Sequence, residues 1–164
     1  SSSGTDYVNP LFASQKANVI AVGMKYVGAY HFFRAASVDD ATAEGKFFLT
    51  QLQANSIATS TIVACDVELS SLDPTADGAT LTKADLEARI AAFYKVLIDA
   101  GYTNTCDYAS SSRFGTWFDQ QGKYAWKADW DASNKPDGAD AWQYTNGFNG
   151  LNLDASKSYS KEFI

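Results

Sequence analysis

The chain alternates between short apolar runs and longer stretches in which apolar residues recur at helical spacing. A short apolar run bounded by turn residues is typical of a buried strand, often one of a parallel sheet. Five such runs are present, at residues 26–33, 61–68, 103–109, 124–130 and 141–144. Residues 1–5 contain only Ser, Gly and Thr, and they are expected to be loop.

Three helices are predicted by apolar stripes that repeat every three or four residues. Each stripe follows residues that favour a helix N-terminus, namely Asn9-Pro10, Ser37 with Asp40, and Thr82 with Asp85. The first and third helices are expected to end at Gly23 and Gly101.

The order of these elements predicts an α/β fold, because strands that alternate with helices form parallel βαβ units. Polar and aromatic residues gather at the expected carboxyl ends of the strands, which suits a TIM-like β/α barrel with its site at that face. Five strands, however, do not close an ordinary eight-stranded barrel. With 164 residues, the chain is expected to be a single domain over residues 1–164.

Two acids stand together at the end of the second apolar run, in the sequence Asp66-Val67-Glu68. Side chains alternate along a strand, so Asp66 and Glu68 share one face, with Cα atoms ~7 Å apart. Burying unpaired carboxylates is costly, whereas a pair of carboxyl groups is what hydrolysis of a glycosidic bond requires. The alternative is that one acid caps the following loop while the other is solvated.

Charge and composition narrow the range of partners. The formal net charge is −6 and the 13 basic residues form no run, which argues against nucleic acid and against an anionic membrane surface. No apolar run reaches the length of a membrane span, and no charged-then-apolar leader stands at Ser1. Aromatic residues make up 14% of the chain, and Tyr and Trp are suited to stacking on sugar rings.

The residues that most often bind metals are few. Cys65 and Cys106 are expected to be buried free thiols, with a single bridge between them as the alternative. One His and no Cys-x-x-Cys pair predict that there is no zinc site. His31 is expected to be structural, because alternation points it away from the face of Tyr30 and Phe32.

Six motifs of this chain occur in a familiar order. They are Tyr7-Val8-Asn9-Pro10, Val27-Gly28-Ala29-Tyr30-His31-Phe32, Asp66-Val67-Glu68, Trp126-Lys127-Ala128-Asp129-Trp130, Trp142-Gln143-Tyr144-Thr145 and Leu153-Asp154. Each motif is weak alone, but the ordered set spans essentially the whole chain and resembles the glycoside hydrolase family 25 muramidases. The resemblance implies an irregular β/α barrel that hydrolyses the β-1,4 bond between N-acetylmuramic acid and N-acetylglucosamine.

The resemblance also implies roles for individual residues. Glu68 matches the general acid, Asp66 its partner on the same strand, and Asp154 the acid near the family's C-terminus. The residues that would line the sugar groove are Tyr30, Phe32, Tyr108, Trp130 and Gln143. No cofactor or metal is implied, the implied partner is the peptidoglycan glycan strand, and the protein is expected to be secreted or released to the cell wall.

The chain departs from the family pattern in two ways. Family members begin with a strand that carries an Asp, followed by a helix and a second strand, and this chain resembles them only from about Ser3-Gly4-Thr5 onward. The first βαβ unit is therefore expected to be absent, and the gap is expected to be filled by a further segment, a second chain or a rearranged sheet. Asp107 replaces a usual apolar residue, and it is either a substitute acid at the groove or a polar residue that faces a loop.

The sequence leaves the mechanism and one alternative function open. Glu68 is expected to be held protonated by burial and by the charge of Asp66. A separation of ~5 Å between the two carboxyl groups favours a covalent intermediate, whereas ~6.5 to 9.5 Å leaves room for a water between them. A third route uses the substrate's own acetamido oxygen, with Asp66 orienting the acetamido group. The alternative function is a catalytically impaired module that keeps the sugar groove. A chitinase-like hydrolase is disfavoured because Ile62 and Ala64 stand where its additional Asp residues belong.

Overall fold

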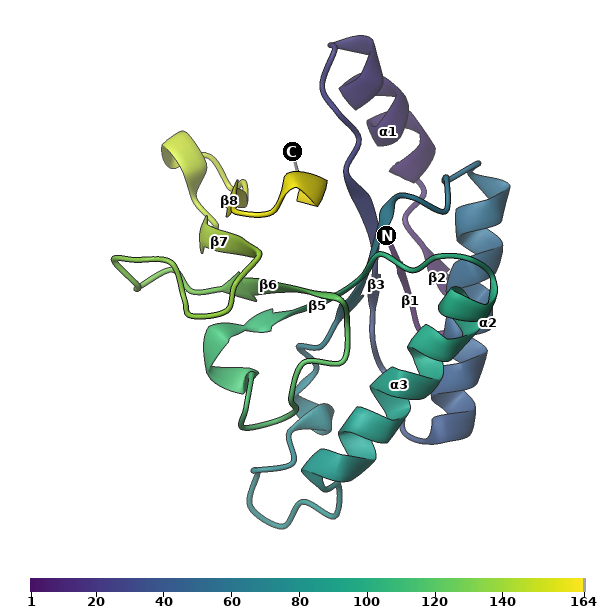
Figure 1. Cartoon of the computed structure of the whole chain (residues 1–164), viewed down its shortest axis with the longest axis vertical. Coiled ribbons are helices and arrows are strands. Elements are labelled where there is room, and N and C mark those ends of the chain that lie inside the picture. Colours follow the sequence, from purple (N-terminus) through teal and green to yellow (C-terminus); the bar gives the residue numbers. More distant parts are fainter. Residues whose placement is uncertain (164) are drawn as a thin grey trace.

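The computed structural model describes residues 1–163, which are built around one eight-stranded sheet (Figure 1). The strand order is β2-β1-β3-β4-β5-β6-β7-β8. The strands are β1 (Ser2–Ser3), β2 (Tyr7–Val8), β3 (Gly28–Phe32), β4 (Ile62–Asp66), β5 (Thr105–Ser110), β6 (Tyr124–Ala128), β7 (Ala141–Thr145) and β8 (Ala155–Ser158). The pairs β1–β2 and β7–β8 are antiparallel and the other five pairs are parallel. The expected α/β class with a parallel sheet is therefore confirmed.

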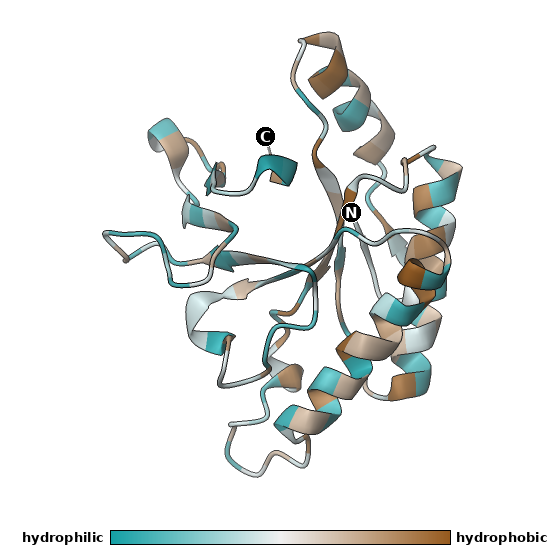
Figure 2. Ribbon diagram, in the orientation of Figure 1, coloured by the Kyte–Doolittle hydropathy of each residue, from teal (hydrophilic) through white to brown (hydrophobic). Residues whose placement is uncertain are grey.

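Two of the three helices cover one face of the sheet. The helices are α1 (Phe12–Ala21), α2 (Val38–Ala54) and α3 (Lys83–Asp99), and short 3₁₀ turns are η1 (Ser70–Leu72), η2 (Ser111–Arg113), η3 (Phe148–Gly150) and η4 (Lys161–Phe163). Helices α2 and α3 lie side by side across the outer face of β3 and β4, and hydrophobic residues recur along both ribbons between hydrophilic ones (Figure 2). Phe48 of α2 and Ile90 and Phe93 of α3 are buried in the larger hydrophobic cluster, so the interface between these helices and the sheet is the main core.

The sheet register aligns the carboxyl ends of the central strands. Phe32 of β3 lies opposite Asp66 of β4, and Asp66 lies opposite Tyr108 of β5. Because side chains alternate along each strand, the residues just before them face the helices. These three strands therefore present Phe32, Asp66 and Tyr108 on the inner face at one level.

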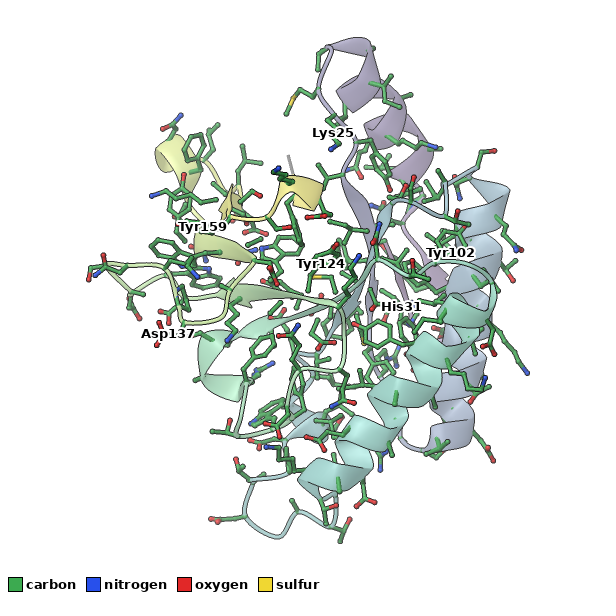
Figure 3. All side chains as sticks on the ribbon, viewed as in Figure 1. Lys25, His31, Tyr102, Tyr124, Asp137 and Tyr159 are labelled. Carbon is green, nitrogen blue, oxygen red and sulfur yellow. The ribbon has the colours of Figure 1, made fainter. Side chains whose placement is uncertain are left out.

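His31 illustrates the outer face. His31 lies beside the helices (Figure 3). Its ring packs against the rings of Phe48 of α2 and Phe93 of α3, at centroid distances of 5.4 Å and 5.3 Å. The ring nitrogens are both used, with Nδ1 2.8 Å from Ser2 Oγ and Nε2 2.9 Å from Glu44 Oε2. The structural role expected for His31 is therefore what its surroundings support.

The inner face carries a smaller apolar cluster that is open to one side. Ile62, Ala64, Cys106 and Tyr124 form this cluster, and beside it lies an open hollow of about 420 Å³. Among the described residues, β2 and β8 each pair with one neighbour only, so the sheet has two free edges. Helix α1 contains no buried residue and projects away from α2 and α3 (Figure 1).

Both cysteines are free and buried, as expected. Cys65 belongs to the core under the helices, whereas Cys106 belongs to the inner cluster. The two thiols therefore lie on opposite faces of the sheet.

Several local predictions were wrong, and each error concerns a short element. Residues 1–5 were expected to be loop, but Ser2 and Ser3 form β1, because they pair with β3. The first helix begins after Leu11 rather than Asn9, whose side chain instead accepts a hydrogen bond from the Leu11 amide at 2.9 Å. Strands β1, β2 and β8 were not predicted. By contrast, Thr82 and Asp85 form the expected reciprocal capping box.

Candidate active site

The two acids of the Asp66-Val67-Glu68 segment lie where β4 leaves the sheet. The strand pairing continues one residue beyond its end, because the Phe33 amide donates to the Asp66 carbonyl at 2.9 Å and the Val67 amide donates to the Tyr108 carbonyl at 2.8 Å. The backbone that carries both acids is therefore held from two sides. Such positions at the carboxyl ends of parallel strands are where barrel enzymes place their chemistry.

Asp66 is a buried acid with an incomplete set of partners. Its side chain is 6% exposed, and its Oδ1 has no hydrogen-bond partner among the described residues. The pKa of Asp66 is raised to about 8, first by burial, then by the charge of Glu68 and a hydrogen bond with its carboxyl group, against the lowering charge of Arg113. A carboxyl group with a pKa of about 8 keeps its proton at neutral pH, so the acid pair carries a proton there.

The position of this raised pKa differs from the expectation. Glu68 is the acid expected to be protonated, but burial acts on Asp66, which lies deeper, whereas Glu68 is partly exposed. The physical reason is the cost of transferring a charged carboxylate out of water, which grows with burial.

An open groove with a volume of about 840 Å³ runs over the acid pair. It is lined by Ser1, Ser2, Ser3, Asp6, Tyr7, Asn9, Tyr30, Phe32, Arg34, Asp66 and Glu68. The structure thus brings four of the predicted site residues into one groove, namely Tyr30, Phe32, Asp66 and Glu68.

Tyr108, Gln143 and Trp130 form a hydrogen-bonded chain beside the acids. Gln143 Oε1 accepts hydrogen bonds from Tyr108 Oη and from Trp130 Nε1, each at 3.0 Å. Gln143 and Tyr108 are buried, while the Trp130 ring is 54% exposed. Burial, Glu68 and Asp66 raise the pKa of Tyr108, so this phenol stays protonated and donates to Gln143. Gln143 therefore fixes an exposed indole next to the acids.

The remaining acids lie in two different settings. Asp154 is exposed just before β8 and does not line the groove, although its charge contributes to the raised pKa of Tyr108. Asp107 is fully buried on the outer face, where Tyr94 Oη donates to Oδ1 at 2.7 Å and the amides of Gln121 and Gly122 donate to Oδ2 at 2.6 Å and 2.8 Å. The idea that Asp107 is a substitute acid at the groove is therefore wrong, because its carboxylate faces α3 and the following loop.

Sequence analysis missed three charged residues at the site. Arg113 contacts the backbone between the two acids, and Arg34 and Asp6 line the groove, with Arg34 Nη1 3.7 Å from Asp6 Oδ1. Arg34 follows the strand of Tyr30 and Phe32 directly, so its position was a usable signal. The position of Arg113 depends on a contact across 46 residues and had no local signal.

Two further findings concern metals and membranes. No group of three or more His, Cys, Asp or Glu side chains within residues 1–163 is arranged to hold a metal ion. None of the helices described here has the length and apolar character needed to cross a membrane.

Comparison with known proteins gives one family. The family model described as glycosyl hydrolases family 25 matches residues 1–150. No match was found among curated protein sequences.

Solved structures share the fold at low sequence identity. The catalytic domain of endolysin ply40, from bacteriophage P40 of Listeria monocytogenes, is 18% identical with a TM-score of 0.74, over 99% of this chain and 81% of that one. A family 25 glycosyl hydrolase from Bacillus anthracis is 19% identical with a TM-score of 0.71, over 99% and 76%. The modular autolysin LytC from Streptococcus pneumoniae is 18% identical with a TM-score of 0.72, over 94% of this chain but 38% of that one. LytC has also been crystallised with a synthetic peptidoglycan ligand. The chain thus spans well under half the length of LytC and matches the barrel of these proteins.

Proposed function

The chain belongs to glycosyl hydrolase family 25, and on this premise we propose that it hydrolyses the β-1,4 bond between N-acetylmuramic acid and N-acetylglucosamine in peptidoglycan. The observation that carries the proposal is the Asp66–Glu68 carboxyl pair, whose two acids line one open groove and of which Asp66 has a raised pKa. Glycoside hydrolysis begins with protonation of the leaving oxygen by such a carboxylic acid.

Glu68 is the proton donor in this proposal. It is the more accessible acid of the pair and it faces the groove, whereas Asp66 lies beneath it. A proton held by the pair at neutral pH is available to Glu68 once a bound sugar covers the groove and removes water from it. Asp66 thus acts as the reservoir that keeps the pair protonated.

A carboxyl group whose pKa is about 8 is protonated at neutral pH, which argues against Asp66 as a nucleophile. Asp66 lines the groove beside Glu68, where it is instead suited to orient an acetamido group of a bound sugar. This favours the route in which the substrate's own acetamido oxygen assists, with Asp66 orienting that group and Asp154 assisting from the far side of Tyr108.

Two exposed aromatic side chains suit glycan strands. Tyr30, which lines the groove, and Trp130, which does not, are 44% and 54% exposed, and such rings bind the apolar faces of sugars. We expect Tyr108 and Gln143 to act by holding Trp130, and Phe32 by shaping the groove beside Asp66. Peptidoglycan as the partner implies secretion or release to the cell wall.

We further propose that additional polypeptide covers the inner face. The free edges β2 and β8, the apolar hollow and the unburied helix α1 are costly for an isolated sheet, because exposed strand edges and apolar surface favour association. A further segment of the protein or a second chain would complete the barrel.

The test is digestion of purified peptidoglycan by the intact protein, with analysis of new reducing ends. Muramic acid reducing ends are expected, and Glu68→Gln is expected to lower the rate by about 10²- to 10⁴-fold, the usual contribution of a general acid. Glu162→Gln, at an exposed acid of η4, is the matched control and should leave the rate unchanged. Absence of muramic acid reducing ends, or full activity in Glu68→Gln, would contradict the proposal.

The second candidate function is a module that binds peptidoglycan without turnover. It is favoured by the position of Asp154, which is exposed and does not line the groove. Sedimentation with purified cell walls separates the two functions, because binding that depends on Trp130 but produces no reducing ends supports the module alone.

A further inference from the structure

Arg113 is a charged residue that the proposed mechanism has not yet used. It ends η2, the short turn after β5, and its Nη1 donates to the Val67 carbonyl at 2.9 Å. Val67 is the residue between the two acids, and its amide is already bound to the Tyr108 carbonyl. Both polar groups of the Val67 backbone are thus held, one by the sheet and one by a side chain.

The guanidinium group is itself held in place. Its central carbon lies 4.0 Å from the centre of the Trp117 ring, a stacking geometry that favours Arg over other cations. The backbone carbonyl of Arg113 accepts hydrogen bonds from the amides of Thr116 and Trp117, at 3.2 Å and 2.8 Å. The loop that follows β5 therefore fixes Arg113 at both its backbone and its side chain.

The charged groups around Asp66 show why the position of Arg113 matters for the acid pair. The ionisable groups that face the pair or line its groove are Glu68 on the same segment, Tyr108 on β5, Arg113 on η2, and Tyr7, Tyr30, Arg34, Asp6 and the α-amino group of Ser1 along the groove. Of the two cationic side chains in this set, Arg34 is turned toward Asp6, whereas Arg113 lowers the pKa of Asp66 against burial and Glu68. Arg113 is thus the cation that acts on the pair.

We propose that Arg113 is a positioning residue for the acid pair, holding the Val67 peptide so that Asp66 and Glu68 stay on one face while its charge balances them. This inference rests on the proposed function for its catalytic consequence. A guanidinium is required because the same group must donate to a carbonyl, stack on an indole and keep its charge at every working pH.

The inference predicts a change in proton affinity as well as in rate. In Arg113→Gln the opposing charge is gone, so the pKa of Asp66 rises, and we expect its titration to move upward by about 1 pH unit. The hydrolysis rate constant kcat is expected to fall by about 10- to 100-fold with a smaller change in KM, because misplaced catalytic groups slow the reaction more than they weaken binding. Arg113→Lys keeps the charge and is expected to restore the titration of Asp66 but only part of the rate.

The experiment measures the side-chain carboxyl titration of Asp66 by carbon NMR in the intact protein, beside kcat and KM on peptidoglycan. Trp117→Phe provides a milder variant, which weakens the stacking without removing the charge, and urea unfolding verifies that each variant is folded. An unchanged Asp66 titration in Arg113→Gln, or equal displacement in Arg113→Lys, would overturn the inference. The NMR titration decides the role of Arg113 even if the wild type releases no muramic acid ends, so failure of the proposed function is recognised separately.

Discussion

Asp66 makes the stability of the protein depend on pH in an unusual direction. Most acids in folded proteins have lowered pKa values and therefore stabilise the fold as pH rises. The pKa of Asp66 is raised to about 8 from its ordinary value of 3.8, so the folded protein binds this proton more tightly than the unfolded chain does. Between these two pH values the folded state holds more protons, and the free energy of unfolding must fall as pH rises.

The magnitude follows from the linkage relation. Where the folded carboxyl is protonated and the unfolded one is not, the free energy of unfolding falls by about 1.4 kcal/mol per pH unit. Between pH 5 and pH 7 the contribution of Asp66 therefore decreases by about 3 kcal/mol, as an upper value because Glu68 shares the proton. Asp66→Asn replaces the protonated acid by a neutral group of the same shape, so this slope should be absent from the variant.

The assay is urea unfolding of wild type and Asp66→Asn at several pH values from 5 to 8. The difference between the two unfolding free energies is plotted, because the effects of all other acids cancel in it. We expect Asp66→Asn to gain stability over wild type as pH rises, while Asp77→Asn, at an exposed loop acid, shows no such trend. A difference that stays constant with pH would refute the raised pKa and the argument built on it.

Two further predictions separate supporting residues from the chemistry. Asp107→Ala removes a buried acceptor of three hydrogen bonds, so the free energy of unfolding should drop by about 2–5 kcal/mol in urea titrations, while kcat at a temperature where the variant is folded stays within a few-fold of wild type. Trp130→Ala should raise KM for peptidoglycan by about tenfold with little loss of stability. Trp130→Phe keeps a stacking ring, so its KM should lie between those of the wild type and Trp130→Ala. An unchanged KM in Trp130→Ala would show that this ring is not part of the binding surface.

The parts of the site that sequence predicted are those that depend on local periodicity. Alternation along one strand is enough to place Asp66 and Glu68 together and to turn His31 away from Tyr30. Strands β1, β2 and β8 have two to four residues each, too few for a periodic pattern, and they exist only because distant strands pair with them. The sequence also did not predict which of the two acids is protonated. The relative burial of Asp66 and Glu68 is decided by the packing of β3 and β5 around β4 and not by the spacing of the two acids.

Asp66 and Asp107 together indicate what distinguishes a chemical acid from a structural one in this fold. They lie on adjacent strands, both are buried, and burial raises the pKa of each. Asp107 faces the helices, where hydrogen bonds donated by Tyr94, Gln121 and Gly122 act against the increase in its pKa. An added Cβ at Gly122 would lie 2.9 Å from the Asp107 amide, so the loop packs tightly against Asp107. Asp66 faces the groove beside a second carboxyl group, with one oxygen that no described residue binds. A buried acid whose donors are complete has little free energy to gain from a ligand, whereas one that lacks a donor gains a hydrogen bond when an N–H arrives. The place of Asp66 on the groove with an incomplete set of partners, rather than burial or the shifted pKa alone, therefore favours a role at the substrate for Asp66 and a role in the fold for Asp107.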